Sequence, residues 1–360
     1  MIRLEPRASV PPLVAAAVPV GAGVAALALA AVPLMLAGVD VGRAFALMAG
    51  GALGSTFAVT ETLTRATPLV FTGLAAAVAF RARLWNIGGE GQLYAGALAA
   101  VAVGAGAVTL PPLLMVPLVV VAGMLAGALL MVVPTIMRTR FGVDEVVTTL
   151  LSNFVVVLFV SMMLDGPLKD PMGGGWPQSA PILAEAELPR LVAQTRLHAG
   201  LVMALAAALL VYGLDRFTVW GFEARAVGLN PAAARFAGLR VNATFLRVGA
   251  LSGALAGLAG VSEVIGLKGY LTTDLSPGFG YTGIVVAMLA MLNPLGVVAS
   301  AVFLAAVFVG ADSMGRALGV STYIASLIVA LSLVSMLVGQ MFLTWRVRLG
   351  RGAAAAGGRP

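Results

Sequence analysis

A short polar stretch, NIGGEGQ at residues 86–92, interrupts a chain that is strongly apolar on both sides of it. It holds two side-chain amides and one carboxylate, each a strong hydrogen-bonding group, and a buried polar group is destabilising unless it is hydrogen-bonded. The stretch can therefore hydrogen-bond a polar solute, or it can hold an irregular turn of the backbone in place. Its residues are Asn86, Gly88, Gly89, Glu90, Gly91 and Gln92, with Ile87 between them.

Glu90 separates these interpretations. It either braces the turn, by accepting hydrogen bonds or by pairing with an arginine, or it lines a solute pathway. A third interpretation leaves it as an exposed carboxylate with little effect. Non-helical backbone at membrane depth is tolerated only where it is buried in protein or lines water, so each interpretation depends on where the chain lies.

The composition indicates a membrane protein. Hydrophobic residues make up 60% of the 360 residues and charged residues only 10%, whereas soluble domains are roughly half apolar and about a quarter charged. Apolar runs of about 18 or more residues, which are typical of membrane spans, recur from end to end. We therefore expect an all-α, polytopic transmembrane helical bundle in the cell's inner (plasma) membrane.

The apolar runs predict about ten spans. The run at 281–292 is too short to cross alone and is followed by Asn293 and Pro294. Because proline disfavours helix at the residue before it, we expect a half-helix that turns there and continues into the next run. The segment 41–64 is expected to be external or interfacial. The expected runs are 13–37, 65–82, 91–109, 113–137, 146–164, 198–216, 245–267, 281–292, 295–311 and 321–343.

Basic residues cluster at both ends of the chain and in one internal loop. The positive-inside rule places such clusters in the cytoplasm, so we expect the N-terminus (1–12), the loop 217–244 and the basic tail (344–360) to be cytoplasmic. The remainder, 13–343, is the expected transmembrane domain, and its proline-rich segment 165–197 is expected outside.

Several local patterns predict helix ends and contacts. Asp144 and Glu145 are expected to begin a helix, because acidic side chains favour the N-terminal end of the helix dipole. Glycines spaced four residues apart predict close helix–helix contacts. The glycines are Gly123 and Gly127 in one run, and Gly249, Gly253 and Gly257 in another.

The cytoplasmic loop carries GFEARAVGLNPAAARFAGLR at 221–240. Asn230 is a favourable N-cap and Pro231 is favoured at the first helical position, while Gly238 suits the C-terminal cap. We expect a short helix over 231–237, which is either a helix that inserts into a groove on a partner or an ordinary loop helix.

This loop sequence, together with three other segments, resembles the permeases of ATP-binding-cassette (ABC) importers of the branched-chain amino acid and ribose superfamily. The N-I-G-x-E-G-Q pattern is similar to that of the branch for nucleosides and simple sugars. The resemblance covers roughly 60–345. The other segments are FRARLWNIGGEGQLYAGALAA, GVDEVVTTLLSNFV and YTGIVVAMLAMLNPLG.

The resemblance implies a division of labour. This chain would form half of a membrane channel and a second homologous permease subunit the other half. Cytoplasmic ABC ATPases would bind ATP and Mg, and an extracytoplasmic solute-binding protein would deliver a small-molecule solute. The short helix would couple transport to the ATPase, through residues that include Arg225, Asn230, Pro231, Ala234 and Arg235.

The chain itself carries few groups for chemistry. It has no cysteine and one histidine, His198, which excludes disulfides, thiol catalysis and a multi-histidine metal site. Lys169 and Lys268 do not stand in a Gly-Lys-Ser/Thr phosphate-binding loop. We expect no catalytic residue, no metal and no cofactor in this chain, and no nucleic-acid partner.

The expected function is the import of nucleosides, with a simple sugar as the alternative cargo of the same machine. An ion-coupled secondary transporter is a different class, and it would usually place an acid near mid-membrane. A membrane-embedded enzyme has the least support. For solute contact, Phe71 and Phe154 offer aromatic walls and Asn153 offers an amide, although each is equally suited to packing.

Overall fold

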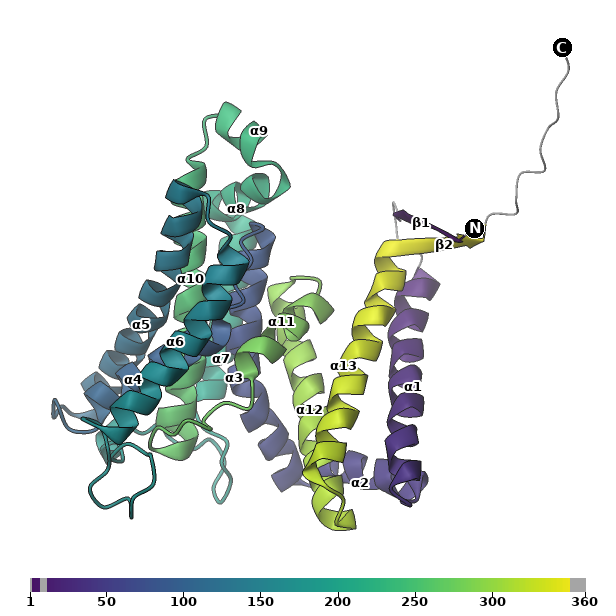
Figure 1. Cartoon of the computed structure of the whole chain (residues 1–360), viewed down its shortest axis with the longest axis horizontal. Coiled ribbons are helices and arrows are strands. Elements are labelled where there is room, and N and C mark those ends of the chain that lie inside the picture. The colour runs from purple at the N-terminus through teal and green to yellow at the C-terminus, as the bar shows by residue number, and fades with distance from the viewer. Residues whose placement is uncertain (1, 7–11, 350–360) are drawn as a thin grey trace, which may run out of the picture. The chain divides into compact units, whose positions relative to one another are not determined.

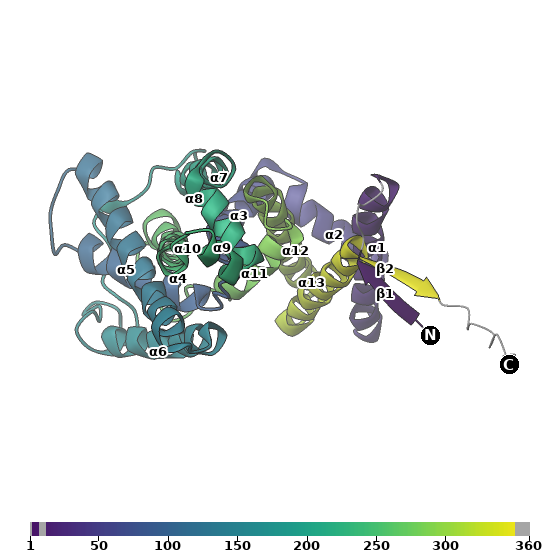
Figure 2. The same ribbon diagram turned by 90° about the horizontal axis from the view of Figure 1, so that it is seen from above.

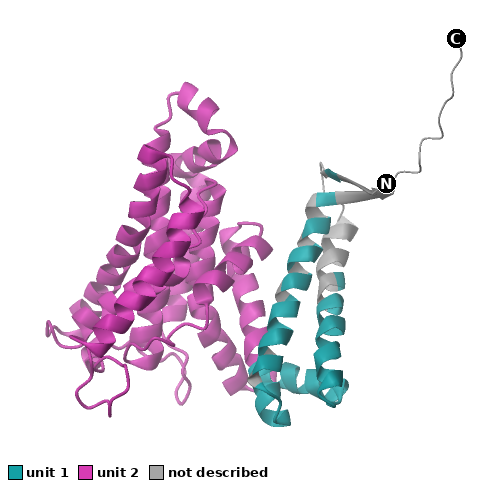
Figure 3. Ribbon diagram, in the orientation of Figure 1, with its two compact units in different colours: residues 1–51, 310–360 teal, residues 52–309 magenta. Residues whose placement is uncertain are grey.

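The computed structural model describes residues 2–6 and 12–349, which form mainly helices (Figure 1). The chain folds into two compact units, the larger comprising residues 52–309 and the smaller comprising residues 1–51 with 310–360 (Figure 3). The larger unit contains both the 86–92 segment and the loop at 217–244. It therefore carries almost every residue to which the sequence assigns a role.

The larger unit is a helical bundle. Its described elements, in chain order, are α3 (Thr56–Arg81), α4 (Gly89–Gly104), α5 (Pro112–Phe141), α6 (Glu145–Asp165), the 3-10 turn η1 (Ala184–Ala186), α7 (Gly200–Phe217), α8 (Val219–Leu229), α9 (Pro231–Phe236), α10 (Val241–Glu263), the π-helical turn η2 (Val264–Lys268), α11 (Phe279–Leu289) and most of α12 (Pro294–Leu318).

Two of these helices form the centre of the larger unit. Most of α3 and α10 is buried, whereas α5, α6 and α7 bury only a narrow stripe each. Figure 2 shows α10 and α4 with α5 on one side and α3 on the other, and α10 packs against all three. The outer helices expose large apolar side chains such as Leu129, Leu158 and Leu209. Such surfaces fit lipid, which has no need of polar partners.

Glycines allow α5 and α10 to meet backbone to backbone. A Cβ added at Gly253 or Gly257 would collide with the main chain of Gly127 or Gly123 on α5. The predicted glycine contacts are therefore confirmed. Gly96 on α4 makes an equally close approach to Gly257, so three helices share one tightly packed crossing.

The smaller unit contains α1 (Pro12–Leu36), α2 (Val41–Leu53), the end of α12 and α13 (Thr322–Thr344). Helices α1 and α13 pack against each other, and Leu34, Met314 and Ile328 lie in the shared core. Strands β1 (Ile2–Pro6) and β2 (Trp345–Leu349) pair antiparallel. The fold is all-α as expected apart from this one short ribbon, in which two extended segments satisfy each other's peptide groups.

The expected number of spans is also corrected. Among the described residues six helices are long and apolar enough to cross a membrane, or seven if the bent pair 24–36 and 41–53 is one span, rather than ten. Helix α4 has 16 residues and α11 has 11, which gives lengths of about 24 Å and about 16 Å. Both are shorter than the roughly 30 Å of a bilayer's hydrocarbon core.

The segment 41–64, which was expected to be external or interfacial, is largely helical. Helix α2 and the start of α3 occupy it, and Ser55 caps α3 through a 3.1 Å bond from the Ala58 N–H. The half-helix at 281–292 is confirmed as α11, which ends before the turn at Asn293. The last part of the basic tail, 350–360, lies outside the described residues.

We predict that Gly257→Ala lowers the thermal stability of the purified protein. Its Cβ would meet only backbone atoms of α5, so the helices must move apart, and such overpacking costs about 1–3 kcal/mol. The matched control is Gly213→Ala in α7, where a Cβ meets nothing within 4 Å. Melting followed by detergent size-exclusion chromatography measures both, and equal melting temperatures would contradict the close-packing account.

Candidate functional site

The 86–92 segment forms the end of the turn between α3 and α4 and the first residues of α4, and it lies inside the larger unit. Asn86, Glu90 and Gln92 are all buried. The backbone leaves α3 at Arg81 and passes through Arg83, whose φ of 53° lies in the left-handed region that few non-glycine residues adopt. A non-helical turn at this depth needs partners for its peptide groups, and neighbouring helices provide them.

Asn86 and Gln92 close the turn by bonding each other. Asn86 Nδ2 donates to Gln92 Oε1 at 2.8 Å, and Gln92 Nε2 donates to Asn86 Oδ1 at 2.9 Å. Asn86 Oδ1 also accepts the Gly88 N–H at 2.9 Å. Asn86 Nδ2 donates to Ser252 Oγ on α10 at 2.9 Å, and that hydroxyl donates to the Ala75 carbonyl on α3 at 2.7 Å. The amide pair is thereby anchored to two central helices.

Asn153, on α6, holds the opposite edge of the turn. Its Oδ1 accepts the Gly91 N–H at 2.8 Å, and its Nδ2 donates to the Ile87 carbonyl at 2.9 Å. The same Nδ2 lies 3.1 Å from the Tyr281 hydroxyl on α11. A Cβ at position 91 would lie 2.9 Å from Asn153 Oδ1, so this approach requires glycine.

Glu90 connects the turn to α11. Its Oε2 accepts the Gly280 N–H at 2.7 Å, in the first turn of that helix. A carboxylate is favourable there because the free N–H groups of a helix N-terminus carry partial positive charge. One turn further along α4, Tyr94 Oη donates to the Thr273 carbonyl at 2.6 Å. The start of α4 therefore holds both the start of α11 and the segment that leads to it.

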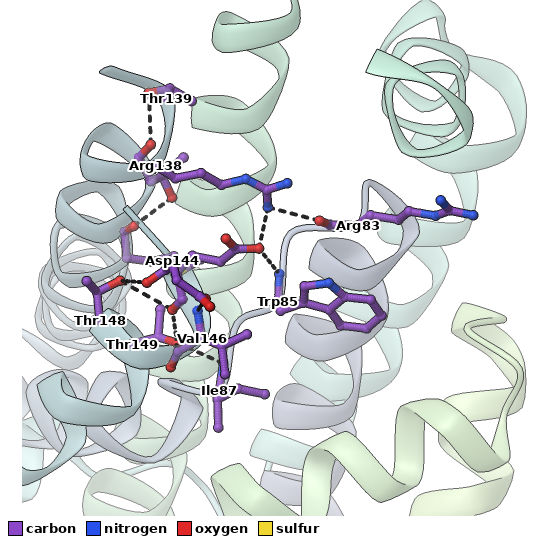
Figure 4. Close-up of polar contacts among 12 residues, drawn as sticks. Arg83, Trp85, Ile87, Arg138, Thr139, Asp144, Val146, Thr148 and Thr149 are labelled. Atoms are coloured by element: carbon purple, nitrogen blue, oxygen red, sulfur yellow. Dashed lines mark hydrogen bonds and ion pairs between the residues drawn. The ribbon is translucent and has the colours of Figure 1, made fainter. Parts of the chain in front are cut away.

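A second polar cluster lies beside the turn, where α5 ends and α6 begins (Figure 4). Arg138 pairs with Glu145 at 2.5 Å and donates to the Arg83 carbonyl at 2.9 Å. Glu145 Oε1 also accepts the Trp85 N–H at 3.2 Å. The Arg138 guanidinium lies 4.5 Å from the centre of the Phe245 ring on α10. This cluster fixes the strained start of the turn to three helices.

Sequence reasoning found only part of this cluster. The expected helix start is confirmed, because α6 begins at Glu145 and the Asp144 carboxylate accepts the Val146 N–H at 2.8 Å. The Arg138–Glu145 ion pair was missed. The sequence feature that could have indicated this pair is Gly142, which lies between the two charged residues. Gly142 adopts a left-handed φ of 66° and reverses the chain there.

The loop at 217–244 contains two helices. The expected helix at 231–237 is confirmed as α9, which ends one residue earlier, at Phe236. Asn230 Oδ1 accepts the N–H groups of Ala232 and Ala233 at 3.0 Å and 3.1 Å. The preceding helix, α8, was not expected, and Asn230 ends α8 as well as capping α9.

Ala234, one of the residues expected to couple this loop to an ATPase, does not lie on the exposed side of α9. Ala234 is only 5% exposed, so its methyl group faces into the protein. Phe236 is 96% exposed and Leu229 is 77% exposed, so these residues, which sequence reasoning missed, belong to the exposed apolar surface of the loop. Arg235 is exposed, whereas Arg225 bonds to Asp215 at 2.8 Å.

The three candidates for solute contact do not come together. Phe71 is fully buried within α3 and Phe154 is 59% exposed on the outside of α6. The amide of Asn153 is occupied by the turn. Within residues 2–6 and 12–349, no group of three or more acidic or histidine side chains is placed to hold a metal ion.

Residues 58–344 match the family described as "Branched-chain amino acid transport system / permease component", and the chain belongs to this family of membrane transport permeases. It is 36% identical to a glucose ABC transporter permease of Haloferax volcanii, over 96% of this chain and 93% of that protein. It is 34% identical to a guanosine ABC transporter permease of Bacillus subtilis, over 87% and 90% of the two chains. A nucleoside ABC transporter permease of Lactococcus lactis is also 34% identical, over 73% and 74%.

We predict that Glu90 acts as a brace in the folded protein. Glu90→Gln keeps one acceptor for the Gly280 N–H, so this variant should assemble. Glu90→Leu removes both acceptors and leaves a buried donor without its partner, which costs about 1–3 kcal/mol. Detergent size-exclusion chromatography should therefore show less folded Glu90→Leu protein. If both variants assemble normally and only the apparent affinity for solute changes, Glu90 contacts solute instead.

Proposed function

We propose that this chain is one half of the membrane channel of an ABC importer that moves nucleosides into the cell. The observation that carries the proposal is the buried N-I-G-x-E-G-Q turn in a chain whose relatives include permeases named for guanosine and for nucleosides. A neutral, hydrogen-bonding solute is consistent with this segment, because its carboxylate, Glu90, already accepts a backbone N–H.

A simple sugar is the second candidate cargo. The relative with 36% identity over almost the whole chain is named for glucose, and a sugar presents the same kind of hydroxyl groups as the ribose of a nucleoside. The same machine would serve either cargo. The difference lies in the solute, which the partner binding protein would deliver.

The proposed partners are a cytoplasmic ABC ATPase, a second homologous permease subunit and an extracytoplasmic solute-binding protein. In this arrangement ATP and Mg bind to the ATPase. The exposed Phe236 on α9, in a loop rich in arginine, suits an aromatic anchor that enters a groove on the ATPase. Central aromatic anchors of this kind contribute about 2 kcal/mol or more to an interface.

We propose that the loop 217–244, the N-terminus (1–12) and the tail (344–360) are cytoplasmic, and that 165–197 is outside. Helix α7 is long and apolar enough to span a membrane and separates the two loops. The arginine-rich loop at its C-terminal end fits the cytoplasmic side by the positive-inside rule. The permease domain between the termini then comprises 13–343.

This topology predicts opposite labelling of two cysteine variants. The chain has no native cysteine, and both Met172 and Phe236 are more than nine-tenths exposed. In cells that produce the permease without the ATPase, an impermeant maleimide should label Met172→Cys on intact cells and leave Phe236→Cys unlabelled, and it should label both after the cells are permeabilised. The reverse pattern on intact cells would invert the topology.

The cargo proposal predicts ATP-dependent guanosine uptake by the complete complex. The permease is reconstituted with the three proposed partners in proteoliposomes, with ATP inside and labelled guanosine outside. Unlabelled nucleosides should compete and leucine should not. Competition by glucose alone would favour the sugar cargo, and robust leucine uptake without nucleoside competition would refute both.

The same vesicles show whether uptake depends on α9. Phe236→Asp places a charge in the proposed contact, so it should lower uptake about tenfold or more and reduce co-purification of the ATPase. Met172→Asp is the matched control, because it introduces the same charge at a similarly exposed position in the other loop. Normal uptake and co-purification with Phe236→Asp would remove α9 from the coupling role.

A further inference from the structure

We propose that Asp215 is a positioning residue that links the α8–α9 loop to the turn between α11 and α12, and so transmits movement of α9 to the transport domain. The inference rests on the proposed function, because it assumes that an ATPase acts on α9. It concerns a cluster of charged side chains that belongs neither to the hydrogen bonds of the 86–92 segment nor to the exposed surface of α9.

The cluster joins the ends of three helices through one carboxylate. Asp215, near the end of α7, pairs with Arg81 at the end of α3 and with Arg225 on α8. Arg225 lies 2.8 Å from Asp215 Oδ1 and also donates to the Asp215 backbone carbonyl. Arg81 uses its second nitrogen to donate to the Leu292 carbonyl at 2.6 Å. Asp215 thus reaches a fourth element, the turn after α11, through Arg81.

Two glycines allow α8 to pack directly against the ends of α7 and α3. A Cβ at Gly221 would collide with the backbone of Asp215, and a Cβ at Gly228 would collide with the carbonyl of Arg81. Asn230 directly joins α8 to α9. Because α8 contacts Arg81 and Asp215 through its backbone and through Arg225, a displacement of α9 has a short and stiff route to both charges.

The turn after α11 is an element with stored strain. Met291 and Leu292 adopt φ values of 50° and 59°, and two successive bulky residues in the left-handed region are uncommon and unfavourable. Arg81 donates to the carbonyl of the second of them. A small cavity lies beside this bond. It is lined by Trp220 and Ala224 of α8, by Leu292 of the turn and by Pro294 at the start of α12. The turn therefore has a reason to change conformation and adjacent space to do so.

The turn also leads to the buried segment described above. Helix α11 runs from the Glu90–Gly280 bond at one end to the strained turn at the other. A single 11-residue helix thus connects the N-I-G-x-E-G-Q segment to Arg81 and Asp215. Coupling between sites needs an element that both of them bias, and α11 with its turn is such an element in the larger unit.

The test compares uptake with ATP hydrolysis in the reconstituted complex. Asp215→Asn keeps the shape and one acceptor but removes the charge that holds both arginines, and Arg81→Lys keeps the charge but loses the planar guanidinium that bonds two acceptors at once. Both variants should assemble and hydrolyse ATP within about twofold of the native rate, while uptake per ATP falls about tenfold. Glu223→Gln is the matched control. Glu223 also lies on α8, but it pairs with Arg247 at 3.5 Å and not with the cluster around Asp215. Uptake per ATP in this variant should therefore equal the native value.

A second measurement needs no transported solute. Met291→Cys is half-exposed in the turn, and its maleimide reactivity in the permease–ATPase complex should change when a non-hydrolysable ATP analogue is added. Asp215→Asn should remove that change, and Glu223→Gln should keep it.

The outcomes separate the two proposals. If the Met291→Cys protein responds to the analogue but the native complex transports neither nucleoside nor sugar, the cargo assignment fails and the link stands. If native protein transports and Asp215→Asn keeps the native ratio, or loses uptake and hydrolysis in equal proportion, the link is overturned and Asp215 is only a structural contact. If the ATPase neither binds nor changes Met291→Cys reactivity, both proposals fail.

Discussion

The larger unit depends on one constraint: a non-helical turn buried in an apolar bundle must find a partner for each of its polar groups. Water is not there to bond them, and an unsatisfied group costs more than a bond gains. The 86–92 segment meets the constraint through side chains of α6 and α10 and through its own amide pair. The segment is therefore a junction to which α3, α4, α6, α10 and α11 are all tied.

Close helix packing makes this junction possible. Gly123, Gly127 and Gly257 bring α5 and α10 together without intervening side chains, which places Ser252 of α10 within reach of Asn86. Gly91 of α4 allows α6 to approach the start of α4, and Gly280 allows α11 to approach it. In lipid, where apolar side chains gain little by leaving their surroundings, such backbone contact is a main source of helix association. The hydrogen bonds of the polar groups therefore depend on the close helix packing that the glycines allow.

The arrangement suits a transport subunit that is moved by another protein. Its exposed apolar residue on α9, Phe236, lies in a loop whose other helix, α8, is fixed to the ends of α3 and α7. The turn beyond α11 is strained and bonded to the same helix ends. A strained connection beside a rigid core concentrates conformational change in that connection, because packed interiors deform little.

The sequence by itself determined the class of protein, the family and many local structures. Apolar runs separated by clustered arginines indicate a membrane bundle, and local chemistry sufficed for the capped helix at α9, the start of α6 and the break at Asn293, because capping and proline effects act over a few residues. Glycine spacing also identified residues at close helix contacts, although the pairing of α5 with α10 appears only in the structure.

Only the tertiary structure decided which polar groups meet. Glu90 and Gly280 are bonded, as are Asn86 and Ser252, and Arg81 and Asp215 are paired. In each case the two partners are far apart in the chain. No local rule relates such residues, because their proximity follows from helix crossing and from the register of each helix. For the same reason the sequence could name Ala234 among the residues expected to couple α9 to an ATPase, although Ala234 is buried and Phe236 is exposed. A six-residue helix has too few turns for its hydrophobic pattern to define which face packs inward.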